Sequence, residues 1–333
     1  MFGRMALISS AALASSAAGL AQAQPAQLPG VAQVVDKTTQ TEDVRFKTEE
    51  YERMTVPVRV SGTGPYRFLV DTGANRTAIS RQLASRLNLS AGPSAELHSA
   101  TGESNVSTAK IPELQLTRRA VRQIDAPLLE SVNIGADGIL GTDSLGAQRI
   151  EFDFQAQTMA VVPSSAPEFH DEPGTIVVEA RRRNGRLIVT DATANGRPLT
   201  VVLDTGSQVT IGNEALRRSL AKGQLSNDTH PVQILSVTGQ TLNGDYMFLR
   251  QLEIGGIDLH NLAVVFAPAH TFSQLKLDNK PALLLGMNAI RAFKKVSIDF
   301  ANLRLRVIVP QSSELDTKMA LKPWLAPPAV GRE

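Results

Sequence analysis

The same series of motifs occurs twice in this chain, in the same order. In each copy an apolar run leads into Asp-Thr-Gly, at residues 71–73 and 204–206, and a helix-like segment follows. A Thr-Gly turn, an apolar pair followed by Gly, and a final apolar run complete both copies. Such a repeat indicates one folding unit that has been duplicated. The chain is therefore expected to fold into two similar lobes.

Length and composition agree with two lobes of modest size. The 333 residues exceed what one hydrophobic core usually covers, and 42% hydrophobic with 20% charged residues is typical of a globular protein. The net charge of +2 is too balanced to favour nucleic acid or an anionic membrane as a partner. The sequence has no cysteine, which excludes disulfides, a thiol nucleophile and Cys-based metal sites.

The N-terminal residues have the pattern of a signal peptide. Arg4 precedes a small apolar stretch that ends in Ala-Gln-Ala, so we expect cleavage after Ala23 and export to the periplasm or the medium. The segment that follows is polar and lacks periodicity. The expected organisation is a signal peptide (1–23), a linker or N-terminal arm (24–50), a first domain (51–165), a second domain (175–311) and a Pro-rich C-terminal tail (312–333).

Local patterns predict mostly β structure around each Asp-Thr-Gly. Apolar runs at 54–60 and 66–70 flank a Gly-rich turn, and a similar pair flanks Asn195-Gly196, which predicts a β-hairpin before each motif. One small helix is expected after each motif, with Ser80 and Asn213 as the N-caps.

Two aspartates that share one site can hydrolyse a peptide bond without a covalent intermediate. One carboxylate accepts a proton from water and the other donates one to the carbonyl, and like charges about 3 Å apart keep a proton between them. Asp71 and Asp204 are the candidates for this dyad. The residues expected to support it, through close backbone approach and hydroxyl hydrogen bonds, are Thr72, Gly73, Ala74, Thr205, Gly206 and Ser207.

The repetition of the motif is what makes it informative. A single Asp-Thr-Gly is weak, because all three residues are common in turns. Here both copies follow three apolar residues, at 68–70 and 201–203, and both precede Ala or Ser. The catalytic interpretation is therefore favoured over that of two ordinary turns.

In these motifs the chain resembles the retropepsin-like aspartic peptidases, over nearly all of residues 51–311. That family has two apolar residues before Asp-Thr-Gly-Ala/Ser, and a later pair of apolar residues with Gly, followed by Asp or Asn. The later motif stands at 139–143 and 284–288, with Gly141 and Gly286. The chain looks like bacterial exported relatives that carry both halves in tandem.

The resemblance implies a mostly β fold, with two tandem β-barrel domains that form a pseudo-dimer within one chain. It implies one catalytic Asp per domain and a flap hairpin over the substrate. The flap candidates are Thr101, Gly102, Thr238 and Gly239, for which an ordinary surface turn is the alternative.

The expected partner is a protein or peptide substrate bound as an extended strand. The implied mechanism needs no cofactor and no metal. We expect a monomer that binds no nucleic acid and is not stably inserted in a membrane once the signal peptide is removed.

Other catalytic classes have weaker support. Ser144 does not lie in a Gly-x-Ser-x-Gly motif, and no glycine-rich phosphate loop is present. The histidines show no paired ligand spacing, which disfavours a zinc site; they are His98, His170, His230, His260 and His270.

Three alternatives remain open within the same fold. The chain could be a catalytically silent peptide-binding module, because a fold alone does not prove activity. It could be a peptidase whose dyad forms only on homodimerisation. It could also be a zymogen in which residues 24–50 cover the cleft.

Overall fold

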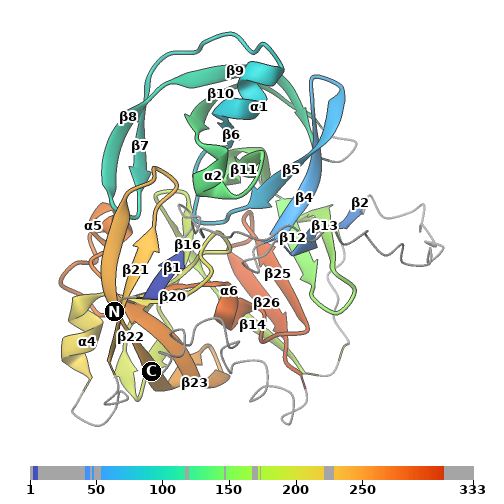
Figure 1. Ribbon diagram of the computed structural model, residues 1–333. Helices are drawn as coiled ribbons and strands as arrows, with labels where there is room; N and C mark the ends of the chain where they lie inside the picture. Colours follow the sequence, from blue (N-terminus) through green and yellow to red (C-terminus); the bar gives the residue numbers. More distant parts are fainter. Residues whose placement is uncertain are drawn as a thin grey trace, which may run out of the picture.

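Two β-rich lobes and a third sheet that joins them make up the fold (Figure 1). The computed structural model describes residues 3–6, 42–45, 47–48, 54–116, 120–145, 148–166, 172, 174–220 and 229–310. The first copy of the repeat, blue to green in Figure 1, forms the upper lobe, and the second copy, yellow to orange, forms the lower one. The expected mostly β, two-lobed class is confirmed.

The first lobe is a closed barrel of six strands. In order around the barrel they are β4 (Met54–Val60), β5 (Thr63–Val70), β11 (Gly138–Leu140), β6 (Ala78–Ser80), β10 (Ala120–Leu129) and β9 (Thr108–Gln115). The barrel closes where β9 pairs with β4, with Leu114 opposite Val60. Along β4, Val56 and Val58 are buried whereas Pro57 is exposed. Alternation of this kind places one side of a strand in the core.

The second lobe repeats this topology, with a longer β22 in the place of β9 and a shorter β19 in the place of β5. Its path runs through β22 (Thr241–Ile254), β23 (Ile257–Phe266), β20 (Thr210–Gly212), β24 (Ala282–Leu285), β19 (Thr200–Leu203) and β16 (Arg186–Val189). β17 (Ala192–Ala194) pairs with β22 as β4 pairs with β9. The outer strands of this sheet are β1 (Gly3–Ala6), β15 (Arg181–Arg183), β18 (Arg197–Pro198) and β21 (His230–Leu235).

Both predicted hairpins are confirmed. β4 and β5 are antiparallel, with Val56 opposite Phe68. In the second lobe β16 pairs with β19, and β17 pairs with β18 around the predicted turn. That turn has φ angles of 47° at Asn195 and 75° at Gly196, which the Asn-Gly dipeptide tolerates well.

The third sheet combines strands from both copies of the repeat. Its order is β14 (Thr175–Glu179), β26 (Arg304–Ile308), β25 (Lys295–Asp299), β12 (Gln148–Asp153), β13 (Thr158–Pro163) and β2 (Glu42–Arg45). The final apolar runs of the two copies form the central pair, in which Glu151 of β12 lies opposite Ser297 of β25. Backbone hydrogen bonds therefore join the lobes, and one hydrophobic cluster continues from Phe68 through Phe152 to Leu249.

Some strands lie where the sequence predicted none. β2 and β3 (Lys47–Thr48) fall within residues 24–50, and they pair with β13 and β4. Strands this short are too brief to show the alternation of apolar and polar residues by which strands are predicted. The sequence therefore predicted a linker or arm for this segment. β1 falls within the predicted signal peptide and runs parallel to β21. Most of residues 1–53 and all of the predicted tail (312–333) lie outside the described residues.

The helices are short. They are α1 (Arg81–Arg86), α2 (Ser131–Ile134), α3 (Thr142–Leu145), α4 (Glu214–Ser219), α5 (His270–Gln274) and α6 (Met287–Ile290). The two predicted N-caps are confirmed, because Ser80 Oγ accepts from Leu83 N at 3.0 Å and Asn213 Oδ1 accepts from Leu216 N at 2.8 Å. Among the described residues no helix has the length and apolar character needed to span a bilayer.

The two caps offer a matched test of local stability. Ser80→Ala removes one capping bond and should lower the free energy of unfolding by about 1 kcal/mol. Asn213→Ala should cost more, because this side chain also donates to Leu277 O and Lys280 O and accepts from Ala282 N. Urea unfolding of both variants measures the difference. Equal costs would show that these additional bonds contribute nothing.

Candidate active site

Each Asp-Thr-Gly follows directly on a buried central strand. β5 and β11 are parallel, with Leu140 opposite Val70, and β19 and β24 form the same pair in the second lobe. Asp71 N donates to Leu140 O at 3.0 Å, and Asp204 N donates to Leu285 O at 3.1 Å. The backbone of both aspartates is therefore fixed by the neighbouring strand, and both side chains are buried.

The turn after Asp71 directs its carboxylate toward the other lobe. Asp71 Oδ1 accepts hydrogen bonds from Gly73 N at 2.8 Å and Ala74 N at 3.0 Å. A Cβ atom added to Gly73 would lie 2.6 Å from Asp204 Oδ1, and one added to Gly206 would overlap the Asp71 carboxyl group. Each glycine thus lies against the aspartate of the opposite lobe. The two carboxyl groups meet where the lobes join, and only glycine leaves room for them.

Thr72 and Thr205 interlock beneath the two aspartates. Thr72 Oγ1 accepts from Thr205 N at 3.1 Å, and Thr205 Oγ1 accepts from Thr72 N at 3.0 Å. The same hydroxyls donate to carbonyl oxygens of the opposite lobe, at Leu203 (3.3 Å) and Val70 (2.8 Å). These four bonds cross the boundary between lobes in both directions, and they hold the two turns in register.

The later motif supports each turn from behind. Gly141 packs against the backbone of Arg76, and Gly286 packs against that of Val209, where a Cβ atom would collide. Ser207 also contributes here, because its backbone oxygen accepts from Met287 N at 2.6 Å. The two predicted apolar-Gly segments therefore lie directly behind the two Asp-Thr-Gly turns.

Two further threonines connect the later motif to the turn. Gly141 N donates to Thr77 Oγ1 at 3.1 Å, and this hydroxyl donates to Asp143 Oδ1 at 2.7 Å. In the second lobe Thr210 Oγ1 occupies the same place, 3.2 Å from Gly286 N and 2.8 Å from an oxygen of Asn288. The sequence analysis missed both, although a threonine six residues after each aspartate was a visible signal.

The environment of Asp71 favours its protonated form. Burial raises its pKa well above the ordinary value, and the nearby charge of Asp204 raises it further. The Gly73 and Ala74 amides and the Arg186 guanidinium oppose this effect. Asp71 Oδ2 has no hydrogen-bond partner within the part of the chain that is described. This oxygen is therefore the one available to carry a proton.

Arg186 is a charged neighbour of the aspartates that the sequence analysis did not identify. It lies on β16 and is buried, and its Nε donates to Gly73 O at 2.7 Å while Nη1 donates to Gln274 Oε1 at 2.6 Å. Burial lowers its pKa, and the charges of Asp204 and Asp71 oppose that decrease. Arg186 therefore holds the first turn from the second lobe and partly balances the two carboxyl groups.

The flap candidates lie at the tips of two hairpins. Thr101 lies between β7 (Ala95–Ser99) and β8 (Gly102–Val106), and Gly102 is the first residue of β8. Thr238 and Gly239 lie between β21 and β22. Figure 1 shows the β7–β8 hairpin reaching from the upper lobe toward α5 in the lower lobe. The tips touch each other, because Thr101 Oγ1 donates to Gln240 Oε1 at 2.8 Å.

Each hairpin tip packs into the core of the other lobe. Ala100, at the first tip, is 4% exposed and belongs to a cluster otherwise made of second-lobe residues such as Val202 and Phe272. Val237, at the second tip, is 2% exposed and belongs to a cluster of first-lobe residues such as Leu69. The tips therefore bridge the two lobes and are not free surface turns.

The threonine pair can be tested by removing one hydroxyl. Thr72→Val keeps the shape of the side chain but leaves Thr205 N buried without its acceptor. We expect the free energy of unfolding to fall by about 1–3 kcal/mol, as for other unsatisfied buried donors. Thr72→Ser, which keeps the hydroxyl, should lose markedly less. Equal unfolding midpoints for Thr72→Val and the wild type in urea would contradict this role.

Asp71→Asn tests the burial of the carboxylate. Because the folded pKa is raised, the native state holds this proton more tightly than the unfolded chain. The contribution of this proton to the free energy of unfolding is fully present below the pKa of Asp in the unfolded chain, about 3.9. It is lost as the pH rises through the pKa of Asp71 in the folded protein. The amide carries no charge and can keep both bonds to Oδ1, so the variant should be more stable than the wild type at neutral pH.

Urea unfolding from acidic to neutral pH measures this difference. The advantage of the variant should shrink as the pH is lowered, because the wild-type carboxyl is then protonated in both states. A variant that is less stable than the wild type at neutral pH would contradict the assignment.

Comparison with known families agrees with the duplicated geometry. Residues 56–147 match the family described as "gag-polyprotein putative aspartyl protease", and residues 190–289 match the family described as "Aspartyl protease". No curated protein matches the chain. The two matched regions together cover more than half of the 333 residues, and each contains one Asp-Thr-Gly. The chain therefore belongs to the aspartyl protease family, in its retropepsin-like form with two copies of the domain in tandem.

Proposed function

We propose that this protein is an aspartic endopeptidase that cleaves extended protein segments, with Asp71 and Asp204 as its catalytic residues. The observation that supports it most is the meeting of two buried aspartates at the lobe boundary, above interlocked threonines. Two carboxyl groups in this setting share one proton. The raised pKa of Asp71 favours this residue as the proton carrier in the free enzyme.

The proposed reaction uses one water molecule and no covalent intermediate. The Asp204 carboxylate accepts a proton from water while the water oxygen attacks the carbonyl carbon of the peptide bond. Asp71 donates its proton to the carbonyl oxygen, which gives a neutral tetrahedral diol. A proton then passes from Asp204 to the amide nitrogen as the C–N bond breaks, and Asp71 recovers its proton from the diol. Both carboxyl groups return to their initial states.

The two hairpins supply the cover that such a reaction needs. Each tip packs on the opposite lobe, against clusters that include Leu69 and Val202 from the strands before the two Asp-Thr-Gly turns, and we propose that a substrate reaches the aspartates only after one hairpin lifts. Once closed, they exclude bulk water and strengthen the electrostatic effects on the carboxyl groups. An extended peptide beneath them would form strand-like backbone hydrogen bonds, with apolar pockets for alternate side chains.

The alternatives within the fold have less support. Both aspartates are retained, whereas a silent binding module would be expected to lose one. The two Asp-Thr-Gly turns meet within a single chain, which favours a monomeric enzyme over one that needs two chains. We also propose export of the protein, on the strength of the N-terminal pattern that ends at Ala23.

Asp71→Asn and Asp204→Asn should each reduce cleavage by about 10²–10⁴-fold or more, because each removes one proton-transfer group. The assay is mass spectrometry of a diverse peptide mixture after incubation with purified protein. Asp258→Asn is the matched control, since this carboxylate is exposed on β23. It should leave cleavage unchanged.

Two outcomes would contradict the proposal. Full activity of either dyad variant would rule out the paired mechanism, and an inactive wild type would favour the silent binding module. Light scattering of the active fraction measures its molecular mass and hence its oligomeric state. An active monomer excludes a dyad formed between two chains.

A further inference from the structure

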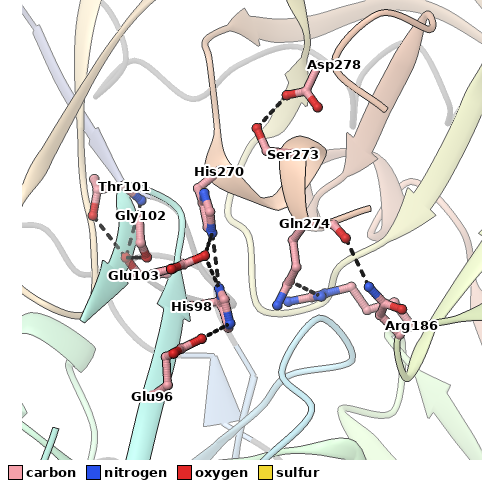
Figure 2. A network of polar contacts seen from close by, with 12 residues as sticks. Glu96, His98, Thr101, Gly102, Glu103, Arg186, His270, Ser273, Gln274 and Asp278 are labelled. Carbon is pink, nitrogen blue, oxygen red and sulfur yellow. Dashed lines mark hydrogen bonds and ion pairs between the residues drawn. The ribbon is translucent and has the colours of Figure 1, made fainter. Parts of the chain in front are cut away.

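Two histidines and a glutamate from different lobes gather at the base of the first hairpin tip. His98 lies on β7, Glu103 on β8, and His270 is the first residue of α5. Figure 2 shows both imidazole rings and the Glu103 carboxylate directed toward one another. The two imidazole side chains are about three-quarters buried, at 28% and 22% exposure, whereas Glu103 reaches in from the surface at 55%. None of the three takes part in the proposed reaction.

The spacing of their atoms is that of a metal-ligand set. His98 Nδ1 lies 3.1 Å from His270 Nε2, and Glu103 Oε1 lies 3.4 Å from the first nitrogen and 3.5 Å from the second. A tetrahedral Zn²⁺ ion with bonds of about 2.0–2.1 Å holds its ligand atoms about 3.3 Å apart. The three atoms therefore form a triangle close to one face of such a tetrahedron.

A second carboxylate prepares His98 for this role. Glu96 Oε1 lies 2.9 Å from His98 Nε2, so it accepts the proton on that nitrogen and leaves Nδ1 with a free lone pair. A carboxylate behind a ligating histidine is a common support of zinc sites, because it fixes the tautomer and the ring orientation. The carboxylates of Glu96 and Glu103 also place negative charge beside the two imidazoles, which favours a divalent cation.

We propose that His98, Glu103 and His270 bind a divalent transition-metal ion, with Zn²⁺ as the best fit, and that this ion fastens the β7–β8 hairpin to α5. Two ligands come from the first lobe and one from the second, so one ion links both. The backbone already brings the two elements together, because His270 N donates to Ala100 O at 2.8 Å. The fourth coordination position is left to water, as in other sites with three protein ligands.

The linear sequence conceals this cluster. His98 and His270 are 172 residues apart, and Glu103 belongs to the opposite strand of a hairpin. The two histidines therefore lack the short paired spacing by which zinc sites are detected in sequences, and Glu103 alone lies near His98 in the chain. Local spacing therefore predicted no metal site, whereas the fold brings three possible ligands together from distant positions.

The competing interpretation is a hydrogen-bonded group without metal. One proton shared between His98 Nδ1 and His270 Nε2 accounts for their 3.1 Å contact. The two interpretations differ in what the cluster does with added metal. A metal ion replaces the shared proton and binds at one equivalent, whereas a purely hydrogen-bonded cluster has no measurable affinity.

The test is a titration of untagged, chelator-treated full-length protein with Co²⁺, followed by competition with Zn²⁺. We expect one equivalent of Co²⁺ to give the intense visible absorption of a tetrahedral site, and Zn²⁺ to displace it. His98→Ala and His270→Ala should each weaken binding by more than about 100-fold, and Glu96→Gln by about 10–100-fold. His260→Ala is the matched control, because this exposed histidine lies 4.0 Å from the carboxylate of Asp258 and belongs to no set of three metal ligands among the described residues.

Hydrogen exchange provides a second measurement that does not depend on the metal spectrum. Zn²⁺ should slow amide exchange in residues 95–106 of the wild type and leave it unchanged in His270→Ala. Circular dichroism shows whether each variant is folded, and Glu103→Gln offers a milder replacement if an alanine variant is not. Absence of Co²⁺ binding by the wild type, or unchanged binding by His98→Ala, overturns the proposal. Neither readout requires peptidase activity, so the site can fail while the proposed function stands.

Discussion

The structure depends on four hydrogen bonds that two threonines, Thr72 and Thr205, make across the lobe boundary. Each hydroxyl of Thr72 and Thr205 accepts from the amide of the other and donates to a carbonyl of the opposite lobe. All of these groups are buried, so any relative displacement of the lobes would leave several of them unsatisfied. Two carboxylates beside each other disfavour closure, because burial and like charge both act against ionisation. The threonine bonds and the shared third sheet provide the opposing stabilisation.

The two lobes share one topology, but their hairpins differ. In the second lobe β22 is a single strand of 14 residues, whereas the corresponding part of the first lobe is divided into β8 and β9. The division makes β7 and β8 a two-stranded sheet of their own, which has no strand pairing with the barrel among the described residues. Its contacts with the second lobe therefore decide where this hairpin lies. The first hairpin is the better candidate for the part of the cover that moves.

The sequence predicted the features that depend on neighbouring residues. The hairpins before each Asp-Thr-Gly, the helix caps Ser80 and Asn213 and the two-lobed arrangement could be predicted because turn chemistry, capping and repetition are local signals. The third sheet could not, since pairing of β12 with β25 joins segments about 145 residues apart. Arg186 was missed for a similar reason, because its partners Gly73 and Gln274 lie 113 and 88 residues away.

The cluster of His98, Glu103 and His270 is also built from distant residues, and it connects the first hairpin to the second lobe. A ligand shifts a conformational equilibrium only as far as its affinities for the two states differ. Ligand atoms taken from β7, β8 and α5 exist as a set only while the first hairpin lies on the second lobe, so an ion bound there selects the closed state. Asp71 and Asp204 are not among the ligands of such an ion. The proposed metal ligands would then control access of the substrate, and the two aspartates would carry out catalysis. Because these are separate groups, access could change without a change in catalysis.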